Sequence, residues 1–468
     1  MYIQQLYTGC LSEAAYYIDS EGEAAIVDPL RDIDSYIRLA KERGAKIKYI
    51  FETHFHADFV SGHLDLAKAT GAPIVYGPGT ETAFSIHKAE DGETFRLGNI
   101  SIEVLHTPGH TVESSCYLVK EADGKPHAIF TGDTLFVGDV GRPDLSSGSL
   151  TKEELAGMLY DSLKAKIMPL PNDVVVYPAH GPGSSCGKNL GPNTYSTLGD
   201  EKEGNYALKE QTREEFIKAV TDGLSAPPSY FPINARINKE GYDSLEAVLQ
   251  AGLQPLDLAS FKEMVDSDNT ILLDTRQAGL FVEGFVPGAI SIGLDGRFAE
   301  WAGSLLPFDK DIVLVTTPGE EKESVVRLAR VGFDKMKGYL KGGFEAWRDA
   351  GEQIDMIIDV EADELAMDIP FDPNLLIVDV RRETEYADGH IKGALNLPLN
   401  DLVDPGSMAN FEENMNLYLH CGGGYRSIIA ASLLKRQGIH NLRNVLGGWS
   451  KIKDQKGIEI EKVNSVLN

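Results

Sequence analysis

Residues 53–63 read THFHADFVSGH and follow KIKYIFE, an apolar run with the composition of a buried strand. His54, His56 and Asp58 alternate along this stretch, and imidazole and carboxylate groups are ligands that divalent metal ions prefer. Their place directly after a strand puts them on a loop at the edge of a sheet. The stretch therefore predicts a metal-binding loop on a β-rich scaffold.

Three further segments end in the same way. The apolar runs ISIEVLH, HAIFTGD and DVVVYPAH lead into TPGHT, TLF and GPG, and they bring His110, Asp133 and His180 to strand ends. Eight of the eleven histidines precede residue 181, and none lies between 181 and 389. We therefore expect metal chemistry only in the first part of the chain.

Length and composition narrow the class of protein. A chain of 468 residues is expected to form two to four domains. The net charge of −27 argues against nucleic-acid and anionic-membrane partners. The first residues lack a signal-peptide pattern, no apolar run reaches the length of a membrane span, and four cysteines in so long a chain suggest reduced thiols. We expect a cytoplasmic protein.

The remaining chain contains a long repeat. ILLDTR (271–276) recurs as LIVDVR (376–381), and GGFEAW (342–347) recurs as GGWSKI (447–452), both with an offset of 105 residues. So long a period indicates tandem α/β domains and excludes a solenoid. The predicted domains are 1–253, 254–355 and 356–468.

The second copy carries a cysteine loop. NLYLH leads into CGGGYRS, and the following apolar pattern predicts a helix of about three turns that stops at Gly438. Glycines let successive N–H groups turn toward Cys421, and the helix dipole adds to this field, so a thiolate or persulfide there is stabilised. The alternative is a buried structural cysteine beside a tight turn. The expected substrate-binding residues are Gly422, Gly423, Gly424, Tyr425 and Arg426.

Four residues separate Cys421 from Arg426, whereas phosphatase loops have five. The smaller loop favours a sulfur atom over a phosphate. The D-x-R, GA-x-N-x-P and C-x4-R-S elements resemble the rhodanese sulfurtransferase family over residues 254–468. This resemblance implies that Cys421 carries sulfane sulfur as a persulfide.

The first copy departs from the rhodanese pattern. Aligning VLVTTPGEEKES with LYLHCGGGYRS puts Thr317 opposite Cys421 and Lys322 opposite Arg426. Threonine cannot form a persulfide, and the neighbouring glutamates would repel an anion. We expect this copy to be catalytically inactive and to act as a spacer, a docking surface or an interface.

The ordered set HxHxD, TPGHT, TGD and PAHG resembles the metallo-β-lactamase fold, which implies an αββα sandwich. Dinuclear zinc hydrolases of this fold have one site that corresponds to His54, His56 and His110. Their other site corresponds to Asp58, His180 and a histidine at residue 59, with Asp133 as a bridge. Here residue 59 is Phe, so the second ion loses a ligand and the site is expected to be mononuclear.

A more specific resemblance is to the persulfide dioxygenases, an iron branch of this fold, through HADFVSGH and GDTLFVGDVGRPDL. It implies one Fe(II) per chain held by His54, His110 and Asp133, which leaves positions open for substrate and oxygen. The groups expected to orient ligands or substrate are His56, Asp58 and His180. Arg142 is expected to hold a substrate carboxylate or sulfite, or alternatively to form a loop salt bridge. Cys186 could bear on the site, whereas Cys116 is expected to be inert.

Nearly the whole chain resembles persulfide dioxygenases of the CstB type, which are fused to tandem rhodanese domains. The resemblance implies oxidation of a low-molecular-weight thiol persulfide with O2 to sulfite and thiol, transfer of sulfur from Cys421 to sulfite to give thiosulfate, and sulfide detoxification. We also expect a homo-oligomer. Two alternatives stay open: a zinc thioester hydrolase of the glyoxalase II kind fused to a sulfurtransferase, and a non-enzymatic sulfur carrier.

Overall fold

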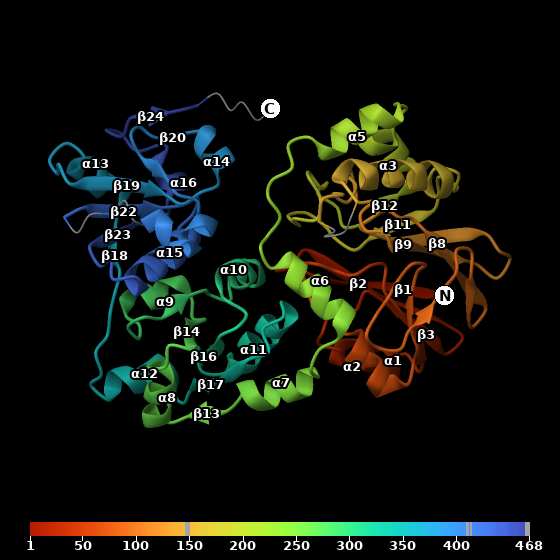
Figure 1. The fold of residues 1–468 in the computed structure, drawn as a ribbon, viewed down its shortest axis with the longest axis horizontal. Helices are drawn as coiled ribbons and strands as arrows, with labels where there is room; N and C mark the ends of the chain where they lie inside the picture. The colour runs from red at the N-terminus through yellow and green to blue at the C-terminus, as the bar shows by residue number, and fades with distance from the viewer. Residues whose placement is uncertain (146–149, 409–410, 412–413, 464–468) are drawn as a thin grey trace. The chain divides into compact units, whose positions relative to one another are not determined.

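A computed structural model describes residues 1–463 except 146–149, 409–410 and 412–413. The chain divides into two compact units, and Figure 1 labels their elements. The first unit comprises residues 1–247 with 328–334, and the second comprises 248–327 with 335–468. Each unit is described by itself.

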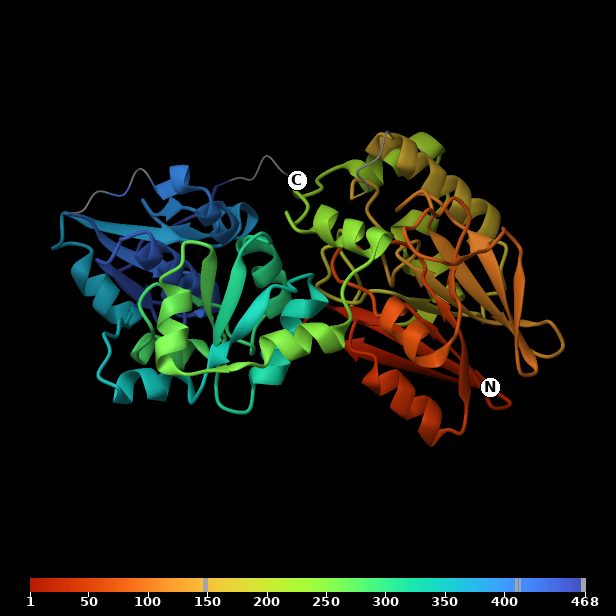
Figure 2. The ribbon, with the colours of Figure 1, turned by 60° about the horizontal axis from the view of Figure 1, so that its bottom comes forward.

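The first unit contains two six-stranded sheets, whose strands run from red through orange to yellow in Figure 2. One has the order β1 (Tyr2–Thr8), β2 (Glu13–Ser20), β3 (Glu23–Val27), β4 (Lys46–Phe51), β5 (Ile74–Tyr76), β6 (His87–Lys88). The other has the order β12 (Ser196–Thr197), β11 (Val175–Pro178), β10 (Pro126–Gly132), β9 (Ser115–Lys120), β8 (Ile100–His106), β7 (Thr94–Leu97). The strands predicted to precede the loops with the candidate metal ligands are therefore present.

Helices cover the outer faces of both sheets (Figure 1). They are α1 (Asp34–Glu42) and α2 (His63–Thr70) on the first sheet, and α3 (Lys152–Ser162) and α5 (Arg213–Thr221) on the second, with α4 (Leu198–Gly204) and α6 (Phe231–Glu240) completing the set. The next helix, α7 (Leu245–Gly252), contains the point at which the chain passes into the second unit. Because side chains alternate along a strand, β2 sends Ala14, Tyr16 and Ile18 into the core between the sheets and Ala15 and Tyr17 into the core beneath α1 and α2. The predicted αββα sandwich is confirmed.

Parallel pairing brings the loops with the candidate metal ligands to one edge of each sheet. In the first sheet Val27 of β3 lies opposite Phe51 of β4, so the residues that follow both strands emerge together. In the second sheet Gly132 of β10 lies opposite Pro178 of β11. The ends of these strands position the site described below.

Residues 328–334 complete the first unit although they lie far along the chain. The guanidinium of Arg31 is fully buried and donates to both carboxylate oxygens of Asp334, at 2.5 and 2.8 Å. The N–H of Val60 donates to the carbonyl oxygen of Arg330 at 2.7 Å. The domain boundaries predicted from the sequence stay predictions.

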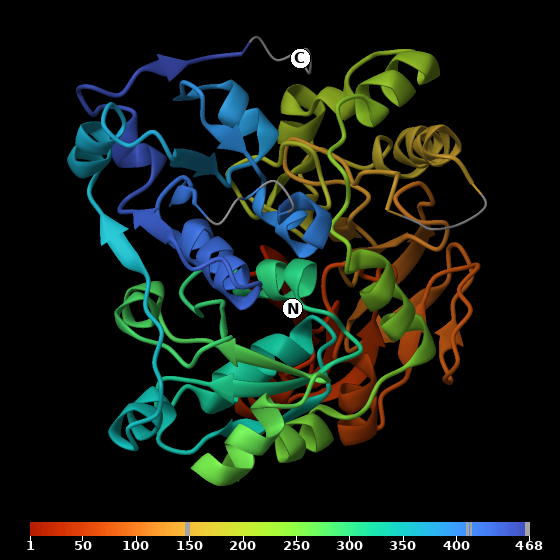
Figure 3. The same ribbon diagram turned by 60° about the vertical axis from the view of Figure 1, so that its left-hand side comes forward.

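The second unit contains two five-stranded parallel sheets of equivalent topology (Figure 3). The first has the order β13 (Pro255–Leu256), β17 (Met336–Leu340), β16 (Asp311–Val315), β14 (Thr270–Asp274), β15 (Ile290–Ser291). The second has the order β18 (Ile358–Val360), β23 (Leu442–Val445), β22 (Asn416–His420), β19 (Leu375–Asp379), β21 (Leu395–Asn396). A separate pair joins β20 (His390–Ile391) to β24 (Ile460–Glu461). The predicted tandem α/β repeat is confirmed.

The α-helices of the two copies correspond except at one position, where the second copy has a 3-10 helix (Leu399–Val403) in place of an α-helix. The first copy contains α8 (Leu258–Val265), α9 (Ala278–Glu283), α10 (Phe298–Leu305), α11 (Glu321–Arg330) and α12 (Gly343–Asp349). The second contains α13 (Ala362–Asp368), α14 (Glu383–Ala387), α15 (Tyr425–Arg436) and α16 (Trp449–Ile452). The helix predicted after the cysteine loop is α15, and it ends just before Gly438.

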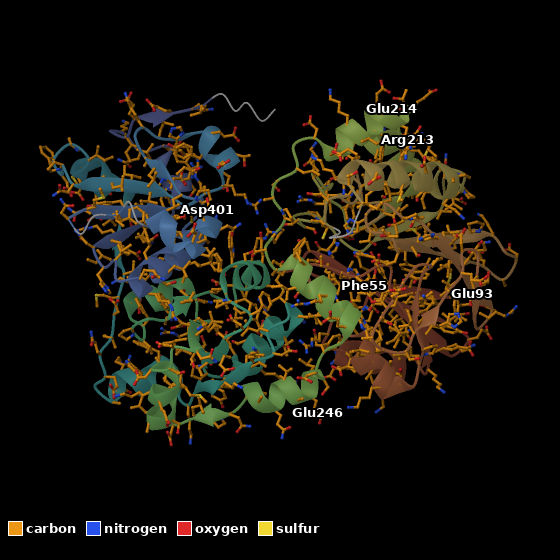
Figure 4. The ribbon with its side chains drawn as sticks, in the orientation of Figure 1. Phe55, Glu93, Arg213, Glu214, Glu246 and Asp401 are labelled. Carbon is orange, nitrogen blue, oxygen red and sulfur yellow. The ribbon has the colours of Figure 1, made fainter. Side chains whose placement is uncertain are left out.

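Acidic side chains such as Glu214 and Glu246 are exposed on the first unit (Figure 4), in keeping with the net charge of −27. None of the helices in the described part of the chain combines the length and apolar character that a membrane crossing requires.

Candidate functional site

Three buried side chains from separate strand ends form a candidate metal centre. His54 follows β4, His110 follows β8 and Asp133 follows β10, and their ligand atoms all lie within 4.8 Å of one another. Oδ2 of Asp133 is 3.7 Å from Nε2 of His54 and 3.4 Å from Nε2 of His110. This oxygen is buried and has no hydrogen-bond partner among the described residues. A metal ion bound by all three atoms would satisfy it.

Hydrogen bonds orient both imidazoles of this triad. Nδ1 of His110 donates to the carbonyl oxygen of Arg142 at 2.9 Å. Nδ1 of His54 donates to Oγ1 of Thr53 at 3.0 Å, because that hydroxyl itself donates to Asp28 at 2.9 Å. Each ring therefore presents an unprotonated Nε2 toward Asp133, which is the tautomer that a metal ion requires.

The protonation states also suit a metal. Burial, together with the neighbouring His56, holds the pKa of His54 well below its usual value, so this imidazole is neutral at pH 7. Burial opposes the charge of Asp133, but the adjacent His180, whose Nδ1 lies 2.7 Å from Oδ1, outweighs it and lowers the pKa of this carboxyl. A neutral His54 and an ionised Asp133 can thus bind a divalent cation without first losing protons.

His180 joins two carboxylates behind the triad. Its Nδ1 is 2.7 Å from Oδ1 of Asp133, and its Nε2 is 2.8 Å from Oδ2 of Asp58. Burial alone would lower the pKa of His180, but these two charges raise it well above its usual value. Cys186 is brought into this group, with its sulfur within 4.8 Å of the ligand atoms of His180 and Asp58. Burial raises the pKa of its thiol, so it is protonated.

His56 faces a different set of groups. Its Nε2 is 3.0 Å from Oδ1 of Asp28 and 3.7 Å from Oε2 of Glu52. The ring of Phe59, which is fully buried, lies against it with centroids 4.3 Å apart. Asp28 and Glu52 are not among the site residues predicted from the sequence. Both directly follow the strand runs EAAIV and KIKYIF, and that position at a strand end could have identified them.

The guanidinium of Arg142 is only 3% exposed and is held by its own loop. It makes a bidentate pair with Asp144 at 2.7 and 2.6 Å and donates to the carbonyl oxygen of Ser225 at 2.5 Å. The loop salt bridge that the sequence left as an alternative is therefore present. Cys116 lies buried in β9, where burial raises its pKa to about 11, as suits an unreactive thiol.

The cysteine loop joins β22 to α15. Sγ of Cys421 accepts a hydrogen bond from the N–H of Gly424 at 3.1 Å and lies 3.6 Å from Oγ of Ser427. Gly424 has a φ of +109°, a conformation that a residue with a side chain rarely adopts. Gly422 and the exposed Gly423 complete the loop. The sulfur thus lies against a backbone donor at a helix N-terminus, as expected.

Two residues of this loop have partners that the sequence did not reveal. Arg426 donates through both terminal nitrogens to Glu385, at 2.6 and 2.8 Å. The hydroxyl of Tyr425 donates to the carbonyl oxygen of Gly293 in the first copy, at 2.8 Å. Their predicted roles in substrate binding stay predictions.

Strand register corrects the alignment of the loop that lacks the cysteine. Val315 pairs with Asp274 in the first copy, as His420 pairs with Asp379 in the second. The residue that corresponds to Cys421 is therefore Thr316, and the expected residue, Thr317, lies one position further on. The loop between β16 and α11 is one residue longer than the loop between β22 and α15. A threonine occupies the cysteine position in either alignment.

Known protein families match the part of the chain that contains the metal centre and, separately, each of the two repeated domains. The sequence model described as "Metallo-beta-lactamase superfamily" matches residues 8–180. The model described as "Rhodanese-like domain" matches twice, at 257–350 and 361–455.

Individual relatives fall into two functional groups. A persulfide dioxygenase, ETHE1, of Mus musculus is 32% identical over 214 residues, 44% of this chain and 73% of that protein. A probable hydroxyacylglutathione hydrolase of Schizosaccharomyces pombe is 34% identical over 181 residues, 37% of this chain and only 66% of the relative's own length. A crystal structure titled as a metallo-beta-lactamase from Staphylococcus aureus is 34% identical with a TM-score of 0.66, covering 73% of this chain and 99% of that one.

Proposed function

We propose that this chain, which belongs to the metallo-beta-lactamase superfamily and continues into two rhodanese-like domains, oxidises thiol persulfides and transfers sulfur through Cys421. The observation that carries the proposal is the buried triad of His54, His110 and Asp133, with one unpartnered carboxylate oxygen. Two histidines and one carboxylate are the donor set of non-haem Fe(II) oxygenases, in which further positions stay open for substrate and oxygen. Similarity to persulfide dioxygenases supports this choice.

The first reaction is RSSH + O2 + H2O → RSH + SO3²⁻ + 2 H⁺. Fe(II) held by the triad would supply the redox chemistry that activates dioxygen. The chain's own groups orient the ligands, since Thr53 and the Arg142 carbonyl fix the two imidazoles. His180, held between two carboxylates, can keep a proton at Nε2 on the side of Asp58.

The second reaction passes sulfane sulfur through the cysteine loop. The Cys421 thiolate attacks the outer sulfur of RSSH, which gives a Cys421 persulfide and releases RSH. Sulfite then attacks the outer sulfur of that persulfide, which gives thiosulfate and restores the Cys421 thiolate. The N–H of Gly424 stabilises the negative sulfur at the start and at the end of this cycle.

The finer features of the proposal follow the CstB-type arrangement. We propose one Fe(II) per chain, a low-molecular-weight thiol persulfide as substrate, a role in sulfide detoxification, a cytoplasmic location and a homo-oligomer. Covalent linkage of the two activities raises the effective concentration of sulfite near Cys421 and limits its loss by diffusion. Arg426, Tyr425 and the glycines of the cysteine loop are the proposed substrate-binding residues, whereas the guanidinium of Arg142 is already engaged by Asp144 and the Ser225 carbonyl.

Metal content and oxygen uptake on a panel of thiol persulfides test the proposal. We expect about one iron per chain and sulfite formation. His110→Ala and Asp133→Ala should remove iron and oxygen uptake but leave sulfur transfer by Cys421 intact. Cys421→Ser is the matched control, with oxygen uptake retained and thiosulfate lost. One or two zinc ions per chain without oxygen uptake would rule the dioxygenase out, and loss of oxygen uptake in Cys421→Ser would contradict the two-step scheme.

A zinc thioester hydrolase is the second candidate. The observation that favours it is His56, whose Nδ1 is buried and unpartnered within the described residues, so this atom is available as the third histidine ligand of a zinc site. Similarity to hydroxyacylglutathione hydrolases agrees with it. Zinc-dependent hydrolysis of an acylglutathione thioester by the purified chain would favour this candidate, and His56→Ala would then abolish zinc binding. Under the dioxygenase proposal, His56→Ala retains iron.

A further inference from the structure

We infer that the first, cysteine-less rhodanese-like domain positions the cysteine loop of the second one, and that Tyr425 is the residue through which it acts. This inference rests on the proposed role of Cys421 as a sulfur carrier. Tyr425 is the first residue of α15 and directly follows Gly424, whose N–H donates to Sγ of Cys421. Any shift of Tyr425 therefore moves the backbone donor that stabilises the sulfur.

The hydrogen bond of Tyr425 fixes its ring to the first domain. The phenol donates to the carbonyl oxygen of Gly293 at 2.8 Å. Burial, together with the charge of Asp295, raises the pKa of this phenol, so it remains a donor throughout the physiological pH range. The bond thus holds the start of α15 at a defined point of the first domain.

Close packing against Gly296 also restrains the ring of Tyr425. A β-carbon at Gly296 would lie 2.3 Å from Cζ of Tyr425, so the aromatic ring rests directly on the backbone of this glycine. Only glycine leaves room for such an approach. The ring is consequently fixed both at its hydroxyl and across its face.

The segment that receives Tyr425 is itself held in place. The N–H of Leu294 donates to the carbonyl oxygen of Thr275, and Arg327 donates to the carbonyl oxygen of Leu294 at 2.6 Å. A second group of contacts joins the body of α15 to the first domain, since the N–H of Ser291 donates to Oγ of Ser432 at 3.0 Å. The inactive domain thus provides a rigid support on which the cysteine loop is assembled.

The rate at which iodoacetamide alkylates Cys421 in the full-length chain, followed against pH, tests this role. Alkylation requires the thiolate, so its pH profile reports how well the loop stabilises the negative sulfur. Tyr425→Phe keeps the ring and removes only the bond to Gly293. We expect a roughly fivefold slower reaction at pH 7 and a midpoint displaced to higher pH, as loss of one hydrogen bond implies. Gly296→Ala, which leaves Tyr425 itself unchanged, should have an effect in the same direction.

Tyr386→Phe is the matched control, because Tyr386 also donates its phenol to a carbonyl oxygen, that of Ala394, within the same domain as Cys421. It should change the rate by less than about twofold. An unchanged pH profile in both Tyr425→Phe and Gly296→Ala, or an equal displacement in Tyr386→Phe, would overturn the inference. The measurement needs no persulfide, so a chain that lacks sulfur transfer altogether but shows the expected displacement would refute the proposed function and leave the positioning role standing.

Discussion

The two rhodanese-like copies share a framework and differ at one loop. In both, the Asp of the D-x-R motif is fully buried and forms a bidentate pair with its Arg, at 3.0 and 2.6 Å for Asp274 and Arg276 and at 2.9 and 2.6 Å for Asp379 and Arg381. Each Arg also donates to a glycine carbonyl eight residues ahead. Only the second copy has a cysteine in the loop between the neighbouring strand and the next helix, which is Cys421 between β22 and α15.

This difference separates what the fold requires from what the chemistry requires. The D-x-R pair is kept where no cysteine is present, so it stabilises the strand ends of either domain. The Arg of each pair also lies over an aromatic ring, Phe344 or Trp449, at 4.4 Å from the centroid. By contrast, the cysteine, the glycines and the basic residue at the helix start are altered together in the first copy. Variants made in parallel in the two copies test this separation.

The largest effect is expected at the cysteine itself. Cys421→Ser should lower sulfur transfer from a persulfide to sulfite by about a thousandfold or more, because a hydroxyl cannot carry sulfane sulfur. Thr316→Ser is the matched change in the first copy and should leave transfer unchanged. Thiosulfate formation measures both. Residual transfer of more than about a tenth in Cys421→Ser would mean that another thiol carries the sulfur.

The next effect concerns stability. Arg381→Ala should lower the free energy of unfolding of its domain by about 3 kcal/mol, because the mutation leaves a fully buried carboxylate unpaired. Arg276→Ala should cost a similar amount in the first copy. Chemical denaturation followed by circular dichroism measures both. Arg348→Ala, which removes an exposed ion pair with Asp349, is the control and should not change the denaturation midpoint. A clearly smaller loss of unfolding free energy for Arg276→Ala would show that the Asp274–Arg276 pair contributes less to stability in the first copy than the equivalent pair does in the second.

A more modest effect is expected at Arg426, which follows the cysteine loop in the first turn of α15. Arg426→Ala should reduce kcat/KM for sulfur transfer by about tenfold, because the loop loses its guanidinium and Glu385 loses the cation that neutralises it. Lys322→Ala removes the residue that corresponds to Arg426 and should have no effect. Steady-state kinetics with a persulfide donor and sulfite measures the comparison. Equal effects of the two variants would place the anion-binding role outside the cysteine loop.

The sequence predicts features that arise from local patterns, such as strand ends and repeats. It does not predict contacts between side chains that lie far apart along the chain. His54, His110 and Asp133 belong to a wider set of candidates that follow apolar runs, because strand ends meet at one edge of a sheet. The resemblance to persulfide dioxygenases, and not the pattern, singled out these three as ligands. The repeat was found from its 105-residue offset, and β14 and β19 bear it out. The partners of these residues could not be predicted in this way.

Those partners are single side chains and carbonyl groups brought close by tertiary packing. Asp144 pairs with Arg142, Glu385 pairs with Arg426, and Gly293 accepts from Tyr425. No periodicity or motif records such pairings. The error of one residue at Thr317 has a related cause, since loop length depends on strand register, which was not visible before β16 could be compared with β22.

The smallest expected effect is also the strictest test of the comparison. Thr316→Cys restores a thiol at the position that corresponds to Cys421, but the loop that follows is one residue longer and contains Pro318 and Glu320 in place of glycines. Proline lacks the N–H that a nest of donors needs, and the glutamate opposes a negative sulfur. We therefore expect the new thiol, in a Cys421→Ser background, to restore less than about a hundredth of thiosulfate formation, measured alongside its rate of alkylation. Substantial recovery would show that a cysteine on this framework suffices for sulfur transfer and that the glycine loop is dispensable.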